Sequence, residues 1–93
     1  MTILDEAWTL SSAVALRPEP FGALAYHFGN RKLTFLKTPA LVEVVRSLGD
    51  HTDVLAALVE AGVPEGQRPA YAAALESLAA ADMIRPRAHE VVA

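Results

Sequence analysis

Residues 21–37, FGALAYHFGNRKLTFLK, contain two runs of alternating side chains separated by a short polar segment. The first run, residues 22–28, alternates large apolar side chains with small or polar ones, and the second, residues 32–37, does the same. A period of two is typical of a strand with one buried face. Gly29 and Asn30 between the runs tolerate the positive φ angles of tight turns. The stretch therefore predicts a β-hairpin.

The two faces of this hairpin differ in side-chain size. We expect the helices of the domain to cover the face with the large side chains, namely Leu24, Tyr26, Phe28, Leu33 and Phe35. A register that differs by one residue would bury the opposite set instead, because successive side chains of a strand point to opposite faces.

One further strand is predicted before the hairpin, at about residues 13–17, and the prolines at positions 18 and 20 end it. The result is a three-stranded antiparallel sheet with strands at about 13–17, 22–28 and 32–37. The strand at 32–37 lies at the edge of this sheet and is bracketed by Lys32 and Lys37.

After Pro39 the apolar residues recur at helical spacing, which predicts helices at about 39–48, 53–61 and 68–82. Thr38 and Thr52 are the expected N-caps. The fold class is therefore α+β and winged-helix-like, with a three-stranded antiparallel sheet followed by three helices. We expect one domain over residues 13–86, with flexible segments at 1–12 and 87–93.

Composition limits the classes of function. The chain has 93 residues, 53% of them hydrophobic and 20% charged, with a formal net charge of −3 and no cysteine. No apolar run approaches the roughly 20 residues of a membrane span, and no signal peptide precedes the domain, so we expect a cytoplasmic protein. Without cysteine there is no iron–sulfur ligation and no thiol catalysis.

Catalytic and metal sites are not predicted. The histidines, His27, His51 and His89, fall in a strand, a turn and the C-terminal segment rather than at the close spacing of metal ligands. No serine lies in a nucleophile motif, and the glycines are isolated. We therefore expect neither enzymatic activity nor a cofactor.

A winged-helix layout makes DNA binding the first alternative. A recognition helix presents Arg, Lys, Asn or Gln to base edges, whereas the third predicted helix offers Gln67 and Arg68 at its start and then a run of alanines. The basic residues are also spread along the chain, so nucleic acid is not an expected partner. A third alternative is a small structural protein that binds a folded partner and no peptide.

The open edge strand favours peptide binding. An extended peptide can add to a sheet edge through main-chain hydrogen bonds, although lysines at such an edge also serve to prevent aggregation. Alanines in the third helix would leave room for the peptide, and basic residues would favour an acidic one. The predicted peptide-binding residues are Arg31, Lys32, Leu33, Thr34, Phe35, Leu36, Lys37, Arg68, Tyr71, Ala72 and Leu75.

Two segments also carry a family resemblance. Residues 14–29, VALRPEPFGALAYHFG, and residues 31–39, RKLTFLKTP, resemble the peptide chaperones of mycofactocin biosynthesis. Those proteins are similar to the pyrroloquinoline-quinone peptide chaperone and to other recognition domains for ribosomally made precursor peptides. The resemblance extends over about residues 8–86, but in the helices it rests on pattern rather than on motif.

The resemblance implies a non-catalytic chaperone. Such domains bind the leader of a precursor peptide as an added strand beside the third strand and against the third helix. They present it to a radical S-adenosylmethionine maturase, which would supply the iron–sulfur chemistry. On this chain the strand is 32–37, and the helix begins at Arg68. An acidic surface with Glu43, Asp50, Asp53 and Glu60 is one candidate for docking the maturase.

Overall fold

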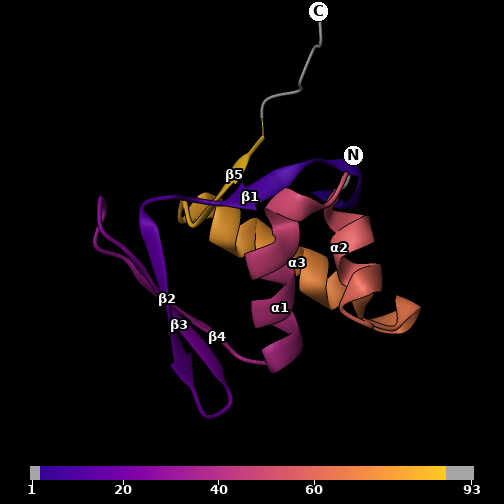
Figure 1. Ribbon diagram of the computed structural model, residues 1–93, viewed down its shortest axis with the longest axis horizontal. Helices are drawn as coiled ribbons and strands as arrows, with labels where there is room; N and C mark the ends of the chain where they lie inside the picture. The colour runs from indigo at the N-terminus through magenta and orange to yellow at the C-terminus, as the bar shows by residue number, and fades with distance from the viewer. Residues whose placement is uncertain (1–2, 88–93) are drawn as a thin grey trace, which may run out of the picture.

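The computed structural model describes residues 3–87 and has the predicted α+β architecture (Figure 1). Strands β2, β3 and β4 form an antiparallel sheet in that order, and helices α1, α2 and α3 lie on one side of it. The predicted fold class is confirmed. In chain order the elements are η1 (Ile3–Asp5), β1 (Trp8–Leu10), β2 (Val14–Glu19), β3 (Gly22–His27), β4 (Leu33–Leu36), α1 (Pro39–Ser47), η2 (Leu48–Asp50), α2 (Val54–Glu60), η3 (Glu65–Gln67), α3 (Arg68–Ala80) and β5 (Ile84–Pro86).

The buried face of the sheet is the one with small side chains, so the first expectation was wrong and the alternative register holds. Ala23, Ala25 and His27 are buried beneath the helices, and Leu36 joins them from β4. Phe28, Leu33 and Phe35 are exposed instead, and Leu24 and Tyr26 are half-buried. The physical reason is distance, because alanines let the helices approach the sheet closely while Leu36 fills the remaining space.

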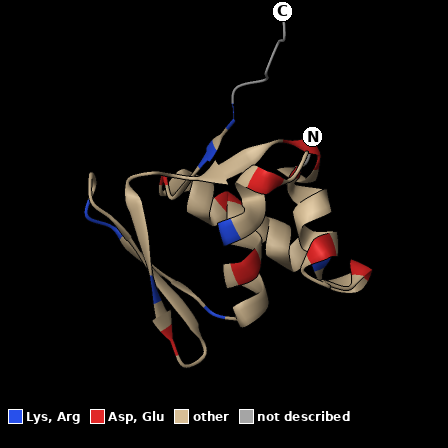
Figure 2. Cartoon of the chain, in the orientation of Figure 1, with Lys and Arg blue, Asp and Glu red and all other residues tan. Residues whose placement is uncertain are grey.

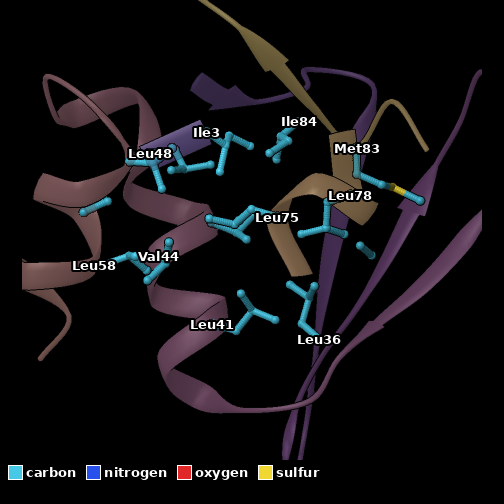
Figure 3. Packing of buried hydrophobic residues seen from close by; sticks show 14 of the residues in the cluster. Ile3, Leu36, Leu41, Val44, Leu48, Leu58, Leu75, Leu78, Met83 and Ile84 are labelled. Atoms are coloured by element: carbon cyan, nitrogen blue, oxygen red, sulfur yellow. The ribbon is translucent and has the colours of Figure 1, made fainter. Parts of the chain in front are cut away.

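The core lies between the sheet and the helices (Figure 3). Side chains from α1, α2, α3, β4 and both ends of the described chain converge there, among them Val44, Leu58, Leu75 and Ile84. Thr38 caps α1 by accepting a hydrogen bond from the Leu41 amide at 3.1 Å. The second helix is capped by Asp53 rather than Thr52, since the Asp53 carboxylate accepts from the Ala56 amide at 2.9 Å.

A second, two-stranded sheet joins the ends of the domain. Strand β1 pairs antiparallel with β5, with Trp8 opposite Pro86 and Leu10 opposite Ile84. Ile3 is buried in the core. These positions differ from the expected flexible segment at 1–12, because a pairing between residues more than 70 positions apart leaves no local pattern in either segment.

Arg87 ties the last described residue to the domain. Its amide donates to the Ala7 carbonyl at 2.9 Å, and its guanidinium donates to the carbonyls of Gly49, His51 and Thr52. The expected flexible tail began at this residue, whereas the structure anchors it. The remainder of that segment, residues 88–93, lies outside the described part of the chain.

Gly22 allows β4 to reach the sheet at its C-terminal end. A Cβ atom at this position would lie 1.8 Å from the Leu36 carbonyl oxygen, which is far inside contact distance. We expect Gly22→Ala to lower the free energy of unfolding by about 1–3 kcal/mol, because the backbone of β4 would have to move. Gly66→Ala is the control, since a Cβ there meets nothing within 4 Å. Equal stability of the two variants in urea denaturation would contradict the close approach.

His27 holds the hairpin turn and links it to the end of α3. Its Nδ1 accepts hydrogen bonds from the amides of Gly29 at 2.9 Å and Asn30 at 3.1 Å, so the proton of the neutral ring lies on Nε2. Nε2 in turn donates to the Asp82 carboxylate at 3.0 Å. Asp82 has a φ of 62°, and the Arg85 guanidinium lies 3.6 Å from its carboxylate.

The contact lowers the pKa of Asp82 below its usual value of 3.8, mainly through the His27 hydrogen bond and also through the charge of Arg85. A carboxyl whose pKa is depressed by folding stabilises the folded state above pH 3.8, and that stabilisation is lost as the pH falls through the folded value. We expect Asp82→Asn to be less stable than the parent at pH 7 and to lose less stability below about pH 4. Thermal denaturation measures this difference. If the melting temperatures of the variant and the parent fell equally as the pH is lowered, the contribution of the Asp82–His27 contact to stability would be contradicted.

Candidate functional site

The outer edge of β4 has free main-chain groups. Among residues 3–87, β4 pairs with β3 on one side and with no strand on the other. The His27 amide donates to the Lys32 carbonyl, and the register then places Ala25 opposite Thr34 and Ala23 opposite Leu36. Hydrogen bonding in antiparallel pairs alternates along the strand. The amides and carbonyls of Thr34 and Leu36 therefore face β3, whereas those of Leu33 and Phe35 face outward.

A groove of about 510 Å³ lies between this edge and α3. Strand β4 and the segment after it form one wall, and α3 forms the other, with Leu41 of α1 also contributing. The lining residues are Thr34, Phe35, Leu36, Lys37, Thr38, Leu41, Ala70, Tyr71, Ala74, Ser77 and Leu78. An extended main chain placed along the edge would thus have one row of its side chains facing this groove.

The helical wall of the groove is made mostly of small side chains. Ala70, Ala74 and Ser77 share one stripe of α3 because residues three and four apart lie on the same face of a helix. Tyr71 reaches across toward α1, and its hydroxyl lies 3.3 Å from the Thr38 hydroxyl. This contact connects the start of α1 with α3 next to the groove.

The predicted peptide-binding residues fall into three groups. Five of them line the groove: Thr34, Phe35, Leu36, Lys37 and Tyr71. Arg31, Lys32 and Leu33 lie exposed at the tip of the hairpin and the start of β4, outside the lining. The three remaining residues belong to α3, and the structure does not bring them into the groove: Arg68, Ala72 and Leu75.

Leu75 lies in the core rather than in the groove. Its exposed fraction is 0%, because it packs in the core between the helices and the sheet (Figure 3). The sequence prediction used the stripe with Arg68, Tyr71 and Leu75, whereas the groove is lined by the stripe with Ala70, Ala74 and Ser77. If Leu75 and Leu78 are placed at the centre of the buried face in a helical projection, the side of α3 that faces the groove is predicted to be the one with Ala70 and Ala74.

Positive charge is concentrated on the sheet. Residues 14–37 carry four cations and one acid, namely Arg17, Arg31, Lys32, Lys37 and Glu19. Acidic residues predominate on the helices (Figure 2). Of the cations, Lys37 lines the groove itself. A bound peptide with carboxylates near this end of β4 would therefore meet a positive potential.

Across residues 3–87 no group of three or more His, Asp or Glu side chains is arranged to hold a metal ion. In the same range, no helix is long and apolar enough to cross a membrane.

Comparison with known proteins identifies the family. The family described as "Peptide chaperone MftB family" matches residues 7–85, which include the sheet, the groove and all three helices. The chain belongs to the MftB peptide chaperone family. The resemblance found in residues 14–39 is thereby confirmed. Members of this family are chaperones and not enzymes, so the prediction that the chain has no enzymatic activity is confirmed as well.

Relatives within the MftB family match most of the chain. A peptide chaperone MftB from Mycolicibacterium smegmatis is 54% identical over 82 residues, which cover 88% of this chain and 80% of the relative. One from Mycobacterium ulcerans is 52% identical over 83 residues, covering 89% of this chain and 76% of the relative. One from Mycobacterium tuberculosis is 48% identical with the same coverage. No solved structure matches the chain significantly.

Proposed function

We propose that this chaperone binds the leader of a ribosomally made precursor peptide as a fourth strand on β4. The observation that carries the proposal is the position of the groove, which runs beside the one edge of β4 whose main-chain groups have no strand partner among the described residues. The amides of Leu33 and Phe35 would donate to the leader, and their carbonyls would accept from it. Every second leader side chain would enter the groove.

The groove favours leader residues of particular types. Ala70 and Ala74 leave space for larger apolar side chains, and Leu36 and Leu78 form an apolar floor. Lys37 beside the groove, with Lys32 and Arg31 farther along the hairpin, favours acidic residues in the flanking part of the leader.

We further propose that the bound peptide is delivered to a radical S-adenosylmethionine maturase in mycofactocin biosynthesis. A leader held on a domain that also docks to the enzyme raises the effective concentration of the reacting end to about millimolar. The leader then determines which peptide is recognised, and it lies away from the atoms that the maturase modifies. The iron–sulfur cluster and the cofactor would belong to the maturase, because this chain has no cysteine. The cytoplasmic location stays a prediction.

The delivery step is tested by a maturation assay with purified components. We expect modification of the precursor at micromolar concentration to need this chaperone, and a precursor without its leader to gain nothing from it. Equal rates with and without the chaperone would contradict delivery. The DNA-binding alternative is tested by a mobility shift at low salt, where electrostatic binding is strongest, and we expect none.

A further inference from the structure

The outer face of the sheet, opposite the helices, has a group of exposed large apolar side chains. Among the described residues, three of the five exposed large hydrophobic side chains lie on or beside it, namely Phe28, Leu33 and Phe35. Cross-strand pairing places Arg17, Leu24 and Phe35 in one row and Ala15, Tyr26 and Leu33 in the next. Phe28 follows the end of β3, two residues after Tyr26, and the two rings meet edge to face with their centroids 5.2 Å apart. The exposed fractions are 62% for Phe28, 59% for Leu33 and 45% for Phe35.

This face reverses the usual arrangement of an antiparallel sheet. A sheet covered on one side normally buries its large apolar residues and exposes polar ones. Here β3 contributes Ala23, Ala25 and His27 to the covered face, next to Val14 of β2 and Leu36 of β4, while Leu24, Tyr26, Leu33 and Phe35 lie on the uncovered face. Packing in the core therefore does not explain why these large apolar side chains lie on the uncovered face. A contiguous exposed apolar surface of this kind marks an interaction site.

Charge indicates what the face binds. The sheet and its turns carry four cations against one acid, and that acid, Glu19, lies 3.8 Å from Arg17. The Arg17 side chain is 80% exposed at the side of the apolar rows. Two copies placed face to face would bring together surfaces of the same sign, which disfavours a dimer. A complementary partner has an apolar patch bordered by carboxylates.

We infer that the outer face of the sheet is the docking surface for the maturase, a folded protein that meets it with an apolar patch rimmed by acidic residues. This inference rests on the proposed function. The groove lies between β4 and α3, on the helical side of the sheet, whereas Leu24, Tyr26 and Leu33 of the apolar rows lie on the outer side. Phe35 belongs to the first row and also lines the groove. One strand thus holds the peptide and the enzyme on its two sides, which places the leader close to the enzyme that modifies its far end.

The test measures the binding of the purified maturase and of a synthetic leader separately, by calorimetry. We expect Phe28→Glu and Arg17→Glu each to weaken maturase binding by about tenfold or more and to change leader affinity by less than about twofold. Both residues are exposed and lie outside the groove lining, and thermal denaturation checks that the variants fold. Val59→Glu is the matched control, an exposed apolar residue on α2 that should leave both affinities unchanged.

Other outcomes separate the inference from the proposed function. Folded variants that retain maturase affinity would overturn the docking surface while the leader site stands. The same holds if Glu60→Lys on the acidic helical surface weakens the complex instead. A wild-type dimer in sedimentation that Phe28→Glu makes monomeric, with maturase affinity intact, would assign the face to a second copy. If the wild-type protein did not bind the synthetic leader, the proposed function itself would be contradicted.

Discussion

Replacing Phe35 with proline is expected to abolish leader binding and to leave the sheet folded. The Phe35 amide faces away from β3, so proline removes a donor that the folded chain does not use and that an added strand requires. The proline ring would also occupy the space that the leader main chain needs beside β4. We expect affinity to fall by at least about tenfold, equivalent to about 1.4 kcal/mol.

Two substitutions control for the loss of the aromatic side chain and for the register. Phe35→Ala removes the side chain and keeps the amide, so it should bind the leader more tightly than the proline variant. Thr34→Pro removes an amide that bonds to β3, and we expect it to destabilise the sheet. If Phe35→Pro bound the leader as well as Phe35→Ala does, main-chain addition at this edge would be ruled out.

Filling the groove from the helical side is expected to have a comparable effect. Ala70 is exposed on α3 and lines the groove, so a tryptophan there leaves the core unchanged and occupies the space for leader side chains. We expect Ala70→Trp to weaken leader binding by about tenfold or more, measured by fluorescence anisotropy with a labelled leader.

Ala73→Trp supplies the matched control on the same helix. Ala73 is also exposed but does not line the groove. It should therefore bind the leader like the parent. If both tryptophan variants had parental affinity, the leader would lie elsewhere on the domain, and equal weakening by both would indicate a general effect on α3.

The hairpin and the helices were predictable because their signals are local. Alternation in residues 22–28 and 32–37 gave both arms, and Thr38 followed by Pro39 marked the start of α1. The pairing of β1 with β5 could not be predicted, since each strand has three residues and its partner lies at the other end of the domain. Gly62, with a φ of 80°, ends α2 as its position after the apolar run suggests.

The covered face of the sheet was the main error in the sequence prediction, and it has a physical origin. Size alternation identifies two faces but does not say which one the helices cover. Hydrophobicity favoured the face with Leu24, Tyr26 and Phe28, whereas close packing of helices against Ala23 and Ala25 decided the outcome. The same ambiguity affected α3, where the stripe chosen for the groove included the buried Leu75.

Amide hydrogen exchange along β4, followed by NMR with and without a saturating synthetic leader, tests the central claim most directly. In the free protein Thr34 and Leu36 should exchange slowly, because their amides bond to β3, and Leu33 and Phe35 should exchange fast. With leader bound, we predict that protection appears at Leu33 and Phe35 and changes little at Thr34 and Leu36. Saturated binding that leaves Leu33 and Phe35 unprotected would contradict the addition of a fourth strand.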